Sequence, residues 1–179
     1  MKRAGLSSLG GLVAVALAWT MPWGAVAHAG QTIKVAVFPF GLIDDSQEGA
    51  TYGQRSDEVE RLALSTAALL DHIRADGRYM VMDLSPIAAE LRDKLPIHSC
   101  NHCEDALARA VGAELAIVAT VQKVSNLILN LNLYVRDVSA ERITRAMSTD
   151  IRGNTDESWL RGVRFLARNR LLVSDEALK

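Results

Sequence analysis

A six-residue segment, His98-Ser99-Cys100-Asn101-His102-Cys103, contains both cysteines of the chain and two of its four histidines. Side chains of these types can support three kinds of chemistry. In an oxidising compartment, Cys100 and Cys103 can close a local disulfide that shapes the loop, and this is the interpretation we favour. Thiolates and neutral imidazoles also bind zinc or copper, and the candidate ligands would be His98, Cys100, His102 and Cys103.

The third alternative is a redox-active thiol pair at the start of a helix, where the helix dipole and a protonated histidine would lower a thiol pKa. Glu104 and Asp105 follow immediately and oppose a thiolate. The strand-CxxC-helix order of thioredoxin sites is also absent. Covalent haem is disfavoured because Glu104 stands where that motif requires histidine. Against a metal site, four donors so close in sequence cannot easily all point at one ion.

Two other groups of charged residues are candidates for contact with a partner. The first contains Asp44, Asp45 and Glu48 in the segment 41–56, which has three glycines and no apolar period and is predicted to be a long loop. The spacing of these acids does not match an EF-hand, so we interpret the loop as solvated, and as a second-choice binding surface. The second group comprises Arg152, Arg161, Arg164 and Arg168.

Three of these arginines recur at helical spacing, so they share one face of the last predicted helix. Guanidinium groups suit an acidic protein or anionic headgroups, although an ordinary solvated face is the simpler interpretation. The chain has no G-x-S-x-G elbow, no H-E-x-x-H pair and no glycine-rich phosphate loop followed by Lys and Ser or Thr. We therefore expect neither an enzyme nor a cofactor.

The N-terminus has the pattern of an export signal. Met1-Lys2-Arg3 precedes an apolar stretch, 12–19, and a small-x-small cleavage motif ends at Ala29. The stretch is shorter than the roughly 20 residues of a spanning helix, and the absence of a nearby cysteine excludes lipid attachment there. We expect residues 1–29 to be a cleavable signal peptide and residues 30–179 to form one α/β domain in the periplasm, with no transmembrane segment.

Cleavage would also change the charge of the chain. Its 20 basic and 21 acidic residues become 18 and 21, so the net charge falls from −1 to −3. A mildly acidic domain lacks the positive field that nucleic-acid binding requires.

Hydrophobic periodicity predicts the order β-α-β-α-α-β-β-β-α, a mixed sheet of about five strands with helices packed on it. Strands are expected at 33–40, 79–83, 115–124, 127–136 and 143–151, the last three antiparallel. Helices are expected at 59–76, 85–95 and 104–111 and after Asp156. The expected apolar positions of the first helix are Val59, Leu62, Ala63, Thr66, Leu69, Leu70 and Ile73, and those of the last are Trp159, Val163, Leu166 and Leu171.

Four segments together carry a family resemblance: "KVAVFPF", "YMVMDL", "AVGAELAIVATVQKVSNLILNLNLYVRDV" and "DIRGNTDESWLRGVRFL". They resemble a domain-of-unknown-function family of small exported proteobacterial proteins. More distantly, they are similar to modules of the TolB N-terminal domain, CsgG and FlgT. The resemblance implies an envelope binding or assembly module without catalytic residues. The expected function is a periplasmic accessory module that binds an unknown periplasmic protein, and the alternative is a metal- or thiol-redox-handling protein.

Overall fold

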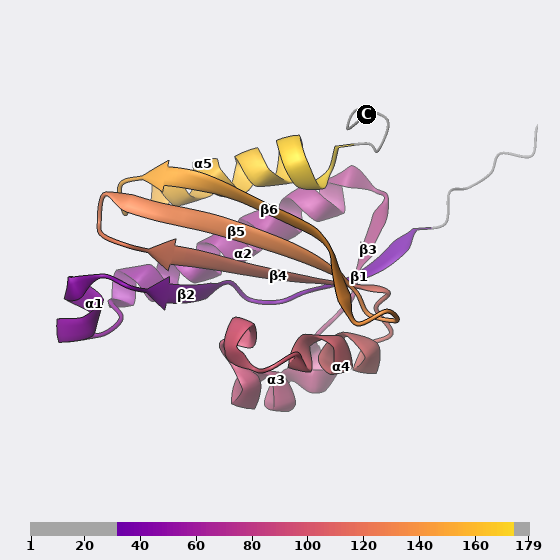
Figure 1. Cartoon of the computed structure of the whole chain (residues 1–179). Coiled ribbons are helices and arrows are strands. Elements are labelled where there is room, and N and C mark those ends of the chain that lie inside the picture. Colours follow the sequence, from indigo (N-terminus) through magenta and orange to yellow (C-terminus); the bar gives the residue numbers. More distant parts are fainter. Residues whose placement is uncertain (1–31, 174–179) are drawn as a thin grey trace, which may run out of the picture.

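A six-stranded mixed sheet with helices on both faces forms the centre of the molecule (Figure 1). The computed structural model describes residues 32–173, so the expected signal peptide, 1–29, lies outside the described residues. The strands are β1 (Ile33–Val37), β2 (Gly41–Asp44), β3 (Tyr79–Val81), β4 (Leu115–Lys123), β5 (Ile128–Asp137) and β6 (Arg142–Arg152). The α-helices are α1 (Gln47–Tyr52), α2 (Ser56–Asp76), α3 (Ala88–Lys94), α4 (Cys103–Ala110) and α5 (Asp156–Leu166).

The strands lie in the order β3-β1-β4-β5-β6, and β2 pairs with the C-terminal half of β4. Strand β1 is parallel to both of its neighbours, whereas β4, β5 and β6 form an antiparallel meander. The predicted mixed sheet, the antiparallel ending and the interior position of the first strand are therefore confirmed. Two helical turns, Ser85–Ile87 and Ile97–Ser99, flank α3, and a π-helical turn, Ala167–Leu171, extends α5.

The prediction of a structureless loop over 41–56 was wrong, because this segment contains β2 and α1. Pro39 has no N–H to donate and follows β1, and the Phe40 N–H bonds to the side chain of Thr66 at 3.0 Å. The chain then returns to β4, which supplies the pairing that the local sequence does not signal, in register Gly41↔Thr120. Ser46 caps α1 by accepting a hydrogen bond from the Gly49 N–H at 3.0 Å.

Helices α2 and α5 cover one face of the sheet (Figure 1). The larger core lies between them and the strands and includes Val35, Val37, Leu69, Ile73, Ile117, Val121, Leu129, Leu131, Leu133, Val135, Ile151, Trp159, Val163, Leu166 and Leu171. The predicted apolar positions of α5 are thus all confirmed. In α2, however, Val59 and Ala63 are exposed, and Glu58 is fully buried in the first turn. The helix also begins at Ser56, three residues before the predicted start at Val59.

Helices α3 and α4 pack on the opposite face, against β1 and β4, around a smaller core. This core consists of Ala36, Phe38, Ile87, Leu91, Ile97, Leu107, Ala108, Ala113, Ala116, Val118 and Val138. Helix α4 ends before Gly112, which has φ 73°, a left-handed conformation that is common for glycine after the end of a helix. The two cores explain why β1 and β4 read as continuous apolar runs, since both of their faces are covered.

Gly41 is required where β2 begins. A Cβ atom at this position would lie 2.2 Å from Nδ1 of His98, whose ring packs directly on the glycine. We expect Gly41→Ala to lower the free energy of unfolding by about 1–3 kcal/mol through overpacking, measured by urea denaturation. The double variant G41A/H98A should recover most of that loss, and a G41A variant as stable as the parent would contradict the packing described.

Candidate protein-binding surface

The last strand, β6, is a long edge of the sheet. Its eleven residues pair with β5 on one side only, and among the described residues no strand pairs with its other side (Figure 1). Most of its residues are exposed or half-buried, and Ile151 is the buried one. An edge strand of this length presents unpaired backbone N–H and C=O groups to which a further strand can add.

A groove of about 320 Å³ lies between the C-terminal half of β6 and α5. Gly162 allows the helix to approach the strand closely, because a Cβ atom there would lie 2.7 Å from Cγ2 of Ile151. Phe165, one turn further along α5, is 39% exposed. The groove is lined by Thr149, Asp150, Ile151, Arg152, Arg161, Gly162 and Phe165. It therefore combines an apolar ring, a helix backbone and a free strand edge.

The charge of the groove comes mainly from two of the arginines predicted from the sequence. Arg152 from β6 and Arg161 from α5 both line it. Arg161 forms an exposed ion pair with Glu157 at 3.3 Å and donates a hydrogen bond to Oγ of Ser158 at 3.2 Å. Asp150 already accepts a hydrogen bond from Asn130 at 2.8 Å. Arg152 has no carboxylate partner among residues 32–173. The groove can thus bind an acidic side chain without breaking a buried ion pair.

The other two predicted arginines lie on the side of α5 that faces α2. Arg164 and Arg168 are exposed, and they lie near His72 of α2. Burial, and then the positive charges of Arg168 and Arg164, hold the pKa of His72 below its ordinary value. The structure therefore places all four arginines on or beside α5, but only Arg152 and Arg161 share the groove.

The acidic residues predicted as a second surface lie elsewhere, at the start of α1. Asp44 and Glu48 form ion pairs with Lys123 at 3.3 and 3.1 Å, and Asp45 accepts a hydrogen bond from Gln122. The interpretation of these acids as solvated was therefore wrong for Asp44, whereas Glu48 remains partly exposed. Burial raises the pKa of Asp44, but the hydrogen bonds from Ser46 and Lys123 outweigh it and hold that pKa below its ordinary value.

Lys123 is the centre of this buried charge network. Its third and shortest ion pair joins Nζ to Oε1 of Glu58 at 2.7 Å, and both side chains are buried. Burial lowers the pKa of Lys123, but the hydrogen bonds that its ammonium group donates to the three carboxylates outweigh burial and raise the pKa. Asn154 also donates to Glu58, at 2.7 Å, and accepts from the Trp159 indole at 3.0 Å. This network is structural, because it joins β2, α1, α2, β4 and the start of α5.

The cysteine segment lies between α3 and α4. Cys100 and Cys103 form a disulfide, with the sulfurs 1.97 Å apart. Of the predicted additional ligands, His98 is turned toward Gly41 with its Nδ1 buried and without a hydrogen-bond partner. His102 is exposed, with its Nδ1 3.7 Å from Oε1 of Glu104. The structure therefore brings both cysteines together but does not gather the four predicted donors around one point.

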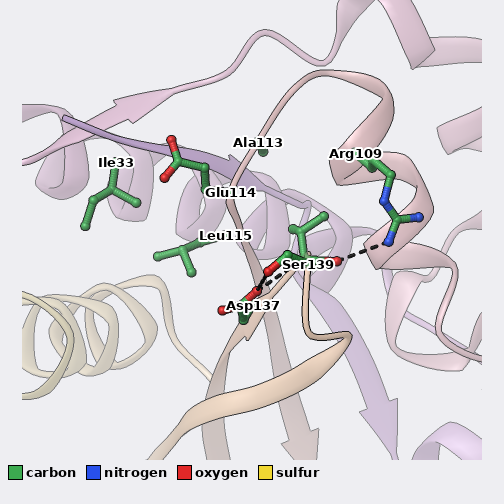
Figure 2. Close-up of a pocket in the computed structure, with 8 residues that line it drawn as sticks. Ile33, Arg109, Ala113, Glu114, Leu115, Asp137 and Ser139 are labelled. Carbon is green, nitrogen blue, oxygen red and sulfur yellow. Dashed lines mark hydrogen bonds between the residues drawn. The ribbon is translucent and has the colours of Figure 1, made fainter. Parts of the chain in front are cut away.

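Another hollow has charged side chains that are used to hold a turn. A hollow of about 500 Å³ lies where the β5–β6 turn meets the loop after α4, and Figure 2 shows side chains that line it. Arg109 donates there to the Val138 carbonyl at 3.1 Å, and Asp137 accepts hydrogen bonds from Ser139. These contacts hold the turn, so the side chains of Arg109 and Asp137 are already committed to the fold.

Two parts of the candidate surface were missed in the sequence. Phe165 interrupts the run of arginines and does not occupy an apolar position of α5, which is a signal for an exposed aromatic residue. The free edge of β6 has no such signal, because period-two alternation reports which faces of a strand are covered and not which edges are paired. Lys123 likewise appears in the sequence only as the polar end of an apolar strand.

The chain is similar to several proteins of solved structure. The structure of the LpoB C-terminal domain from Escherichia coli matches with a TM-score of 0.50 and 16% identity, covering 69% of this chain and 85% of that one. At this identity, the match concerns the fold alone. Lipoprotein GNA1162 from Neisseria meningitidis also matches, with a TM-score of 0.45 and 17% identity over 79% of this chain and 98% of that one. TolB from Acinetobacter baumannii matches with a TM-score of 0.41 and 11% identity, over 76% of this chain and 28% of that one.

No curated protein matches the chain. Within residues 32–173, none of the helices has the length and apolar character needed to cross a bilayer. A family model described as "Protein of unknown function (DUF2380)" matches residues 33–171. This match confirms the expected membership in a family of unknown function, and the chain belongs to the DUF3280 family.

Proposed function

We propose that this protein is a non-catalytic binding module of the periplasm that accepts an extended segment of a partner protein along β6. In this proposal residues 1–29 are removed as a signal peptide and residues 30–179 form a single domain. The observation that carries the proposal is the unpaired eleven-residue edge of β6 beside a groove with two guanidinium groups. The partner is an unidentified protein.

The groove indicates the chemistry of the partner segment. Strand addition satisfies the backbone groups of β6, and every second side chain of the added segment would then point toward α5. Arg152 and Arg161 favour Asp or Glu at such positions, and Phe165 favours an apolar side chain between them. We therefore expect an extended partner segment that places both acidic and apolar side chains against the groove.

Site-specific cross-linking tests the proposal. A photoreactive amino acid replaces Ala146, an exposed residue of β6, and in a matched variant replaces Met80, an exposed residue of the opposite edge strand β3. We expect one discrete adduct from position 146 in intact cells and none from position 80. Mass spectrometry of the adduct should identify an extended segment of the partner with acidic residues.

Binding of a synthetic peptide with that sequence then tests the role of the charges. We expect R152E/R161E to weaken the affinity about tenfold or more, because each replaced arginine loses a charge-assisted contact and gains repulsion. The affinity should also fall with ionic strength. The matched control R92E replaces an exposed arginine of α3 and should bind like the parent. Equal adducts from both edges, or an affinity unchanged by R152E/R161E, would refute the proposal.

A further inference from the structure

The strongest unexplained group of side chains surrounds the disulfide at the start of α4. The two sulfurs and a carboxylate oxygen of Glu104 all lie within 4.8 Å of one another. Cys100 Sγ lies 3.6 Å from Oε2 of Glu104, a side chain that is itself almost buried. Two sulfur donors and one carboxylate, converging from a single turn of the chain, form the donor set of a site for a thiophilic divalent cation.

We propose that reduction of the Cys100–Cys103 disulfide creates a site for a zinc-like cation, held by Cys100, Cys103 and Glu104. In the oxidised form the sulfurs are bonded to each other and are poor ligands. In the reduced form the S–S bond is gone and the two sulfurs move apart, so that each thiolate can bind the ion at about 2.3 Å. The disulfide therefore controls whether the site exists. This inference is independent of the proposed binding at β6.

The electrostatics of the segment favour a cation only when the thiolates form. Helix α4 begins at Cys103, so its positive N-terminal end stabilises thiolates. Glu104 forms an ion pair with Arg136 at 3.2 Å, but Arg136 also pairs with Asp105 through both carboxylate oxygens, at 2.9 and 2.5 Å. Asp105 can thus keep Arg136 neutralised when Glu104 turns toward the ion.

The ligand set differs from the one predicted from the sequence. His98 is not part of the donor group found among the described residues, because its ring packs against Gly41. Glu104, which the sequence suggested only as an obstacle to a thiolate, becomes the third ligand. Water fills the fourth, open position, where the exposed His102 lies nearby.

A dithiol supplies the electrons that reduce the Cys100–Cys103 disulfide. The dithiol gives two electrons and two protons, the S–S bond breaks, Cys100 and Cys103 become thiols, and the dithiol becomes its own disulfide. Binding of the divalent cation then releases both thiol protons to the solvent.

A cobalt titration of the purified chain tests the inference. The chain is reduced with a phosphine, freed of reductant under nitrogen and titrated with Co²⁺, with far-ultraviolet circular dichroism recorded in parallel. We expect one Co²⁺ per reduced chain, with a thiolate-to-cobalt charge-transfer band and the intense visible bands of tetrahedral cobalt. Zn²⁺ should displace the Co²⁺. The oxidised chain should show neither band.

Variants assign the ligands. E104Q should lower the affinity of the reduced chain by at least the 10–100-fold that loss of an outer-shell partner costs. The matched control H98Q should bind like the parent, and C100S/C103S should bind no ion while its dichroism shows whether the fold survives without the bridge. Unchanged affinity in E104Q, equal binding by the oxidised chain, or unfolding of the chain on reduction would each overturn the inference.

Discussion

Replacing Lys123 by methionine is expected to lower the free energy of unfolding by about 3–5 kcal/mol. The methionine retains most of the apolar stem but removes the ammonium group that neutralises Glu58, which is fully buried. A buried carboxylate without a partner costs more free energy of folding than the ion pair contributed. Urea denaturation of K123M, with an unchanged slope against urea, measures the loss.

Two further variants separate charge from packing. E58Q/K123M should be more stable than K123M, because the neutral amide no longer leaves a buried charge without a partner. K34M, which removes an exposed lysine of β1, should stay within about 0.5 kcal/mol of the parent. If K123M unfolded like K34M, the network around Lys123 would not hold the fold together as described.

The same network sets part of the acid dependence of stability. The pKa of Asp44 is lower in the folded chain than the ordinary value of 3.8, so its contribution is present above that value and is lost as the pH falls through the folded pKa. K123M should therefore show a smaller loss of stability per pH unit in this acidic range than the parent does.

Trp159→Ala is expected to cost about 3–5 kcal/mol, because it leaves a cavity in the larger core, where the indole is completely buried. Trp159→Phe keeps much of the volume but removes the indole N–H that bonds to Asn154 at 3.0 Å, so the expected loss is about 1–2 kcal/mol. Urea denaturation should rank the variants in this order.

F165A provides the matched control for the aromatic residue. Phe165 lies on the same helix but is partly exposed, and its replacement should cost less than about 1 kcal/mol. A W159A variant that lost no more stability than F165A would show that the indole does not fill the core. An equal loss in W159F and W159A would assign the whole effect to the hydrogen bond.

The elements with regular periodicity could be predicted from the sequence. Strand β5 alternates leucine with polar residues because one of its faces lies under α5, and Leu129, Leu131 and Leu133 are all buried. Leu127, which begins the same alternation, precedes the strand and is exposed. Gly77 and Gly112 end helices with positive φ, and glycine directly after an amphipathic segment is a sequence signal for such an end. These signals are local, so they survive without knowledge of the tertiary structure.

The parts that could not be predicted depend on contacts between distant segments. Strand β2 forms only because β4 is beside it, and its four residues carry no pattern of their own. The sequence suggests that Glu58 is exposed and that the neighbouring Val59 is buried. In the structure Glu58 is buried and Val59 is exposed, because Lys123, 65 residues away, forms an ion pair with Glu58. The candidate surface was also predicted only in part. The sequence indicated its arginines, but not the free strand edge or the groove that Arg152 and Arg161 share.

The hydrogen bond from Asn154 to Glu58 joins residues 96 positions apart and has a consequence for biosynthesis. A polypeptide that leaves the ribosome or a translocation pore N-terminus first presents Glu58 long before Asn154 and Trp159 emerge. Until then, the inner face of the meander has no α5 to cover its leucines. Products of early termination should therefore be preferred targets of quality-control proteases. The native state should be reached in one late step, in which α5 packs on the meander and Asn154 bonds to Glu58.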